Sequence, residues 1–145
     1  MLPPDFVITS TLKVGVVYKI EAPELIQTEE PHYFTVVAIA ESDNFLVLST
    51  TQLHKKINYL QKKGYDLDTL AHITPTENNG LTQDSYFNCN EYYTLTKDEL
   101  IEKVKENKLN IAGTFNKEEY STLVNSITLS EVNDIPKFLL KYDTI

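Results

Sequence analysis

The most constraining feature of this sequence is an apolar stretch at 31–52, which a turn cluster divides into two runs of β-forming residues. The turn cluster at 41–44 (ESDN) predicts a β-hairpin. In the first run, 33–40, both alternating faces are apolar, which indicates a strand that is covered on both sides or lies within a small curled barrel. The second run, 45–48, leads into 49–52 (STTQ). Small hydroxyl side chains at the end of a buried strand are either helix caps or parts of a functional site.

The length and composition of the chain indicate one globular domain. Its 145 residues, 41% of them hydrophobic, are enough for a substantial core. We expect a single domain over 1–145, with a lead-in at 1–12 and a C-terminal extension at 130–145. No apolar run reaches membrane-spanning length, and the first residues (MLPPD) lack a signal-peptide pattern. The single cysteine, Cys89, excludes an internal disulfide. These features favour a cytoplasmic protein that has no membrane partner.

The charged residues argue against non-specific nucleic-acid binding. The net charge is −8, whereas such binding depends on cations that neutralise phosphates. All 13 basic residues are lysine, so no bidentate guanidinium–phosphate contact can form. RNA is therefore a possible but disfavoured partner, and any phosphate chemistry must use lysine, histidine, backbone amides or a metal.

The remaining patterns predict short strands interleaved with helices. We expect strands at 6–9, 14–20, 71–74, 85–95 and 109–112, and helices at 52–63, at 97–106 and after Asn116. Capping boxes support the last two helices, and Gly64 would end the first. The expected fold class is α+β: a small, strongly bent antiparallel sheet with about three added helices.

The motifs along 13–127 resemble, in order and spacing, the PemK/MazF family of toxin–antitoxin toxins. The matching segments are 13–18 (KVGVVY), Pro31 with the strand after it, 49–52 (STTQ), 80–85 (GLTQDS) and 94–100 (TLTKDEL). The resemblance implies an SH3-like β-barrel, a homodimer, and an endoribonuclease that needs neither metal nor cofactor. It also implies a groove that an antitoxin-like peptide or protein fills.

The resemblance also assigns residues to the chemistry. The family hydroxyl that holds the phosphate falls on Thr50, and its partner falls on Gln52. The two family arginines fall on Glu30 and Tyr93, so both cations are absent. His32, which follows Pro31, could replace the missing arginine as catalytic acid or base, because histidine commonly does this work near neutral pH. The catalytic candidates are therefore His32, Thr50 and Gln52.

Each candidate also has a purely structural interpretation. Ser49 with Gln52 fits a capping box, and His32 could be an exposed residue at a strand start. The substrate-binding candidates are Thr51, Asn88, Asn90 and Tyr93. On one face of the strand expected at 85–95, polar and aromatic side chains would either stack bases or form half-solvated sheet surface; they are Tyr86, Asn88, Asn90 and Tyr92.

Two further groups of residues do not predict a site. A lysine cluster on the expected helix at 52–63 is typical of a solvated helix face; it comprises Lys55, Lys56, Lys62 and Lys63. The three histidines show no metal-ligand spacing, so no metal site is expected.

Two functions follow from the sequence. One is a divergent toxin-type endoribonuclease, which the absence of the family arginines opposes. The alternative is a non-catalytic SH3-like module that binds a peptide or protein in the barrel groove. An enzyme needs a replacement cation close to Thr50, and this requirement distinguishes the two functions.

Overall fold

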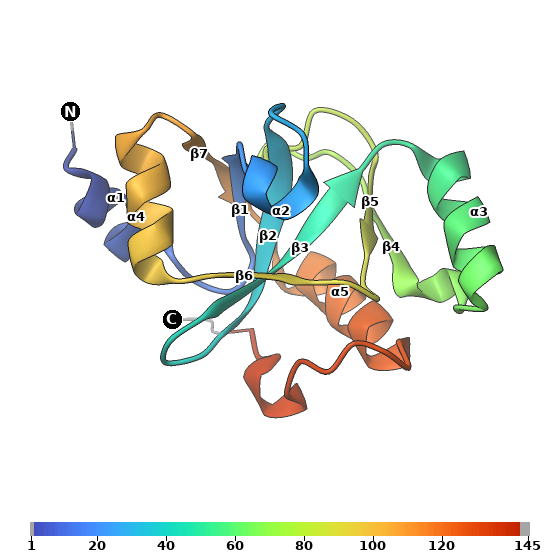
Figure 1. The fold of residues 1–145 in the computed structure, drawn as a ribbon. Coiled ribbons are helices and arrows are strands. Elements are labelled where there is room, and N and C mark those ends of the chain that lie inside the picture. The colour runs from blue at the N-terminus through green and yellow to red at the C-terminus, as the bar shows by residue number, and fades with distance from the viewer. Residues whose placement is uncertain (1, 143–145) are drawn as a thin grey trace.

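The computed structural model describes residues 2–142 as one antiparallel seven-stranded sheet with helices on both of its faces (Figure 1). The strand order is β4-β5-β3-β2-β1-β7, and β6 pairs with β3 outside this path. The strands are β1 (Val16–Ile20), β2 (His32–Ile39), β3 (Asn44–Thr50), β4 (Leu70–Ile73), β5 (Ser85–Asn88), β6 (Tyr93–Leu95) and β7 (Leu109–Thr114). The α+β class is confirmed. The sheet is open, with β4 and β7 at its edges, so an SH3-like barrel stays a prediction.

The predicted hairpin at 31–52 is confirmed and forms the centre of the sheet. β2 pairs with β3, and a register shift between Val36 and Ala38 marks an irregularity that bends the pair. The other edge of β3 carries two partners: 44–46 pair with β6, and 49–50 pair with β5. Because β3 joins these strands, its last residues lie where several elements meet.

The single strand predicted at 85–95 is wrong, because the chain turns between β5 and β6. The side-chain Oδ1 of Asn88 accepts a hydrogen bond from the backbone N–H of Asn90 at 3.1 Å. Such a local bond offers the backbone a turn in place of a continuing ladder. The turn at 89–92 also moves Asn90 away from the face that Asn88 occupies.

The described residues contain five α-helices rather than about three. They are α1 (Pro4–Thr11), α2 (Pro23–Ile26), α3 (Leu53–Lys63), α4 (Lys97–Lys105) and α5 (Lys117–Leu129), joined by two 3₁₀ turns at Leu67–Thr69 and Lys137–Leu139. The edge strand predicted at 6–9 is wrong: Pro4 opens a helix there, and Ile8 is fully buried. α2 lies in the connection between β1 and β2, where no helix was expected.

The three predicted helices and their caps are confirmed. Thr96 with Glu99 forms a capping box for α4, and Asn116 with Glu119 forms one for α5. Gly64 ends α3 with a φ of 76°, a conformation that glycine adopts at little cost.

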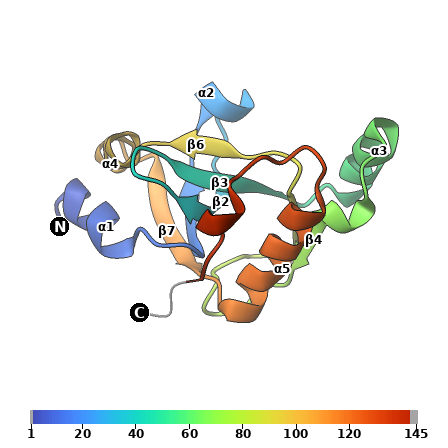
Figure 2. The ribbon, with the colours of Figure 1, turned by 90° about the horizontal axis from the view of Figure 1, so that it is seen from below.

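Two hydrophobic cores lie on opposite faces of the sheet (Figure 2). On one face, α5 and the C-terminal segment cover β1–β3; Ile135 is buried there, and Tyr142 packs against the same core. On the other face, α1 and α4 pack together over Tyr18 and Phe34. The C-terminal extension, as far as residue 142, thus docks back onto the sheet.

The helices are short. In the described part of the chain, no helix combines the length and apolar character that a membrane crossing requires.

Candidate functional site

A groove lies where β2 begins and β3 ends, beside the first turns of α3; we call it the Thr50 groove. It consists of two adjoining cavities of about 560 Å³ and 400 Å³ that share the walls around Thr50. The shared lining residues are Glu30, His32, Ser49, Thr50 and Gln52. The three catalytic candidates from the sequence are thus brought together, although they lie up to 20 positions apart in the chain.

The Thr50 side chain is held by the backbone that follows it. Its Oγ1 accepts a hydrogen bond from the N–H of Gln52 at 3.1 Å. The alternative capping box from Ser49 to Gln52 does not form: Gln52 is the N-cap of α3, and no side chain caps this end. A threonine hydroxyl that accepts one hydrogen bond can still donate its own proton, for example to a phosphate oxygen.

The imidazole of His32 is oriented by the backbone of Glu30. Its Nδ1 lies 2.9 Å from the backbone carbonyl oxygen of Glu30. A carbonyl oxygen can only accept, so Nδ1 carries the proton in this contact. In the neutral ring, Nε2 is therefore the unprotonated nitrogen, which suits a catalytic base.

Three lysines line the groove; the sequence assigned two of them, Lys55 and Lys56, to a solvated helix face and did not single out the third, Lys19. Lys55 and Lys56 line the larger cavity from α3, and Lys19 lines the smaller one from β1. The Lys19 ammonium also lies 5.3 Å from the centre of the Tyr33 ring. Positions three and four residues after Gln52 share its helix face, and this spacing was the available signal for Lys55 and Lys56.

A third, smaller cavity of about 10 Å³ adjoins the groove behind Thr50. Asn88, Glu91 and Tyr93 line it together with Lys56. Burial raises the pKa of the Tyr93 phenol, and the nearby Glu91 charge raises it further. Tyr93 thus stays a neutral hydrogen-bonding group beside Thr50.

Glu91 is engaged by a second tyrosine. The Tyr59 hydroxyl donates a hydrogen bond to Glu91 Oε1 at 3.2 Å. Burial and the Glu91 carboxylate both raise the pKa of Tyr59. This carboxylate, and that of Glu30, which lines both cavities of the groove, are unfavourable for a bound anion.

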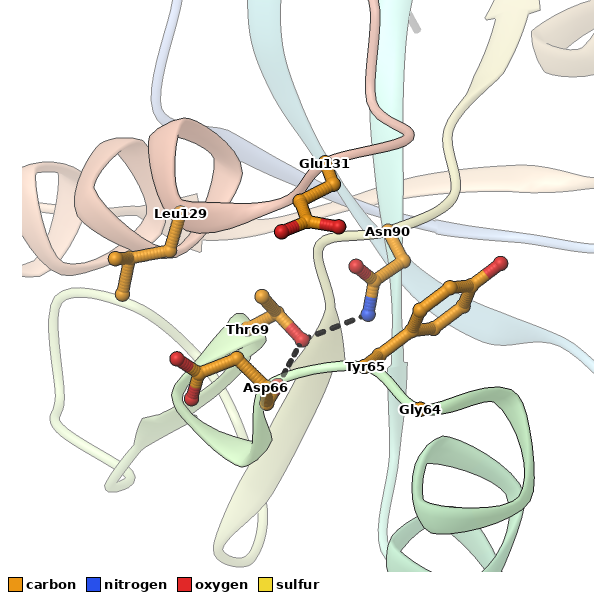
Figure 3. A pocket seen from close by; sticks show the side chains of 7 residues that line it. All are labelled: Gly64, Tyr65, Asp66, Thr69, Asn90, Leu129 and Glu131. Carbon is orange, nitrogen blue, oxygen red and sulfur yellow. Dashed lines mark hydrogen bonds between the residues drawn. The ribbon is translucent and has the colours of Figure 1, made fainter.

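Of the seven residues predicted for the site, Asn90 is the one that lies elsewhere. Thr51 lines the smaller cavity of the groove, and Asn88 and Tyr93 line the cavity behind Thr50. Asn90 instead lines a separate pocket of about 270 Å³ at the end of α3, which we call the α3 C-terminal pocket (Figure 3). Its amide points toward the Thr69 hydroxyl, 2.7 Å away.

The predicted aromatic strand face is divided. Tyr86 pairs across the sheet with Thr50, and its ring stacks on His72 with centroids 4.7 Å apart. Tyr92 instead donates a hydrogen bond to Asp134 at 2.6 Å, on the side of the C-terminal segment. Of these two tyrosines, Tyr86 is the one that pairs with a residue of the groove.

Within residues 2–142, no group of three or more His, Cys, Asp and Glu side chains lies close enough together to hold a metal ion. The groove presents the His32 imidazole, the Gln52 amide, three lysines, several hydroxyls including that of Thr50, and one carboxylate, that of Glu30.

Comparison with models of known protein families gives no match for this sequence. No curated protein matches it either. Among solved structures, a protein described as an endoribonuclease from mycobacterial species matches with a TM-score of 0.53 and 16% identity, over 87% of this chain and 96% of that one. The chain has the fold of this endoribonuclease. At such low identity the likeness concerns the fold.

Proposed function

We propose that this protein is a divergent, cytosolic PemK/MazF-like endoribonuclease that cleaves RNA in the Thr50 groove. The observation that carries the proposal is the cluster of cationic and proton-transferring groups around Thr50: His32, Lys55 and Lys56 line one cavity with it. A groove lined by Glu30, Tyr93 and apolar residues alone would have opposed an enzyme. The fold likeness to a mycobacterial endoribonuclease supports the same conclusion.

The reaction is a transfer within the RNA chain. His32 Nε2 accepts the proton of a ribose 2′-hydroxyl, and the 2′ oxygen attacks the adjacent phosphorus. The bond from phosphorus to the 5′ oxygen breaks, water in the open groove protonates that oxygen, and a 2′,3′-cyclic phosphate remains. The Thr50 hydroxyl donates to a phosphate oxygen, and the lysines offset the charge of the pentavalent transition state.

Lysines differ from the family arginines in how they bind. An ammonium acts as a compact point charge and lacks the planar fork that grips two phosphate oxygens. We therefore expect activity that is slower than that of an arginine site and strongly dependent on salt. The homodimer implied by the family resemblance is part of the proposal.

The test is incubation of the purified protein with mixed RNA in EDTA. Wild type should cleave, and a His32→Ala/Thr50→Ala double variant should lose activity by about 10²-fold or more, as expected for loss of an acid–base group. His54→Ala is the matched control, because His54 lies on α3 but lines neither cavity of the groove. Cleavage that persists in the double variant would place the reaction elsewhere or in a contaminant.

Two double variants of equal charge test whether the groove lysines contribute to cleavage. Lys55→Gln/Lys56→Gln should lower cleavage on the order of tenfold, because it removes two attractive charges beside the phosphate. Lys62→Gln/Lys63→Gln removes the same charge from the other end of α3, outside the groove, and should leave the rate unchanged.

The alternative function is a non-catalytic module that binds a peptide in the same groove. The observation that favours it is the apolar part of the larger cavity, which includes Ile26, Leu48 and Tyr59. With the lysines nearby, this lining fits an amphipathic acidic segment, such as an antitoxin-like peptide. Wild type that leaves RNA intact at every protein concentration but binds such a peptide would replace the first proposal.

A further inference from the structure

Asn88 carries a buried hydrogen-bond donor that has no acceptor in the protein. The residue is 6% exposed, and its Nδ2 is one of two buried side-chain polar atoms without a partner among residues 2–142. Leaving such a donor unsatisfied destabilises the folded protein, because the group gives up its hydrogen bonds to water and gains none in return. Buried amide donors are nearly always satisfied, so this one calls for a physical reason.

The orientation of the Asn88 amide follows from its other end. Oδ1 accepts hydrogen bonds from the backbone N–H of Asn90 at 3.1 Å and from Asn90 Nδ2 at 3.0 Å. Exchanging the oxygen and nitrogen would set an NH₂ group against two donors. Nδ2 is therefore the end that faces away from Asn90.

The Asn88 side chain lies on the side of the Thr50 groove and not in the protein core. β3 and β5 pair with Thr50 opposite Tyr86, so Asn88, two residues after Tyr86, shares the sheet face of Thr50. It lines the cavity of about 10 Å³ behind Thr50, and Lys56 lines that cavity too. This cavity shares Leu48, Ser49, Thr50 and Lys56 with the larger cavity of the groove.

We propose that Asn88 Nδ2, with the Lys56 ammonium, binds a non-bridging oxygen of the RNA phosphate that lies on Thr50. The proposal rests on the function proposed above and adds a phosphate-oxygen pocket to it. A neutral amide donor and an ammonium form an anion site without a guanidinium. In place of the absent arginines, such a pocket provides fixed hydrogen-bond donors that stabilise the charge of the transition state.

Glu91 sets the selectivity of this pocket. Its carboxylate lines the same cavity and receives the Tyr59 hydrogen bond. Repulsion by this carboxylate keeps affinity for free phosphate low, so the pocket needs the rest of an RNA chain to fill it well. A weak response to inorganic phosphate and a stronger one to RNA are therefore expected.

The direct test follows the Asn88 side-chain amide by NMR while inorganic phosphate is added to the wild-type protein. The Asn88 Nδ2 resonances should shift with saturation, and the Asn58 side-chain amide, on the exposed side of α3, should not. Shifts at Asn58 but not at Asn88 would overturn the proposal, as would no shift at either amide.

Asn88→Asp is the matched variant. It keeps an acceptor for the Asn90 N–H and turns the donor into an acceptor, so phosphate affinity should fall about tenfold or more, the effect of losing a charge-assisted hydrogen bond. Asn58→Asp adds the same charge outside the cavity and should have little effect. Lys56→Gln, which leaves Asn88 intact, should weaken the amide shift about as much. Unchanged affinity in both Asn88→Asp and Lys56→Gln would overturn the pocket.

The outcomes separate this pocket from the nuclease proposal. If wild type and Asn88→Asp cleave RNA equally in EDTA, the nuclease stands and the pocket fails. If phosphate shifts Asn88 in the wild type but RNA stays intact, the pocket stands and the nuclease fails.

Discussion

The two ends of α3 face two pockets of opposite character. At its start, the Thr50 groove gathers Lys55, Lys56 and His32. At its end, the α3 C-terminal pocket is lined by the carboxylates of Asp66 and Glu131 and by Gly64, which ends the helix (Figure 3). The helix dipole adds to this difference, positive at the start and negative at the end. A chain with a net charge of −8 can therefore still present a local anion site.

The two pockets also differ in how they use an asparagine. Asn90 is fully engaged: it donates to Thr69 and Asn88, and its Oδ1 accepts from Ser130 at 2.8 Å. Asn88 uses only its oxygen and keeps an unpaired donor. Asn90 therefore stabilises the fold at the α3 C-terminal pocket, whereas the Nδ2 group of Asn88, beside the Thr50 groove, remains available to a ligand.

Reversing the charges at the start of α3 should have the largest effect on RNA binding. Lys55→Glu/Lys56→Glu should weaken RNA binding by about 100-fold or more, since like charges opposite one another cost several kcal/mol. Asp66→Lys/Glu131→Lys should leave groove binding nearly unchanged, because neither residue lines the groove. Fluorescence anisotropy with a labelled single-stranded RNA measures both. Equal effects of the two double variants would contradict a localised site.

The free energy of unfolding should depend more on the α3 C-terminal pocket than on the Thr50 groove. Asn90→Ala leaves Thr69 and Ser130 without their partner and should lower the free energy of unfolding by about 2–3 kcal/mol. Thr50→Ala should cost under about 1 kcal/mol, because it removes a single local bond in a partly exposed turn. Urea denaturation of both variants measures the difference. A larger loss for Thr50→Ala would make Thr50 primarily structural.

Removing the Glu91 carboxylate should strengthen anion binding in the groove. Glu91→Gln should raise phosphate affinity about twofold to fivefold, the range of one partly exposed charge pair. It should also lower the pKa of Tyr59 and Tyr93, because the Glu91 charge raises both. Ultraviolet titration of tyrosinate detects this as earlier ionisation on raising the pH. Unchanged titration would show that burial alone shifts these phenols.

The smallest expected effect is on the reactivity of Cys89, in the turn at 89–92. Cys89 lies between Asn88 and Asn90, is fully buried, and burial raises the pKa of its thiol to about 12. Reaction with a disulfide reagent at pH 8 should therefore need opening of this turn. Saturating RNA should slow the reaction slightly, and rapid labelling of the folded protein would show that the turn opens freely.

Most of the fold could be predicted because local signals and global packing agree. The hairpin, the two capping boxes and Gly64 each rest on short-range chemistry that the structure keeps. α1 was missed because its β-branched residues favour a strand, whereas Pro4 at its first turn and packing of Ile8 against α4 favour a helix. Local propensity alone does not weigh such tertiary contacts.

The site could be predicted only in part. His32, Thr50 and Gln52 come together because they flank one hairpin, a short-range consequence of strand pairing. Lys56 lies one helical turn after Gln52, a spacing that was available in the sequence, whereas Asn88 approaches Thr50 through the placement of β5, which no local pattern encodes. Asn90 was misplaced because a side-chain bond of its neighbour Asn88 ends the strand.

The most direct measurement is a map of amide chemical shifts on adding a single-stranded oligonucleotide whose 2′-deoxy sugars prevent cleavage. We predict the largest shifts at His32, Thr50, Lys56 and Asn88, with Asp66 and Glu131 unaffected. Shifts concentrated at the α3 C-terminal pocket, or no shifts at millimolar ligand, would contradict the assignment of the Thr50 groove as the RNA site.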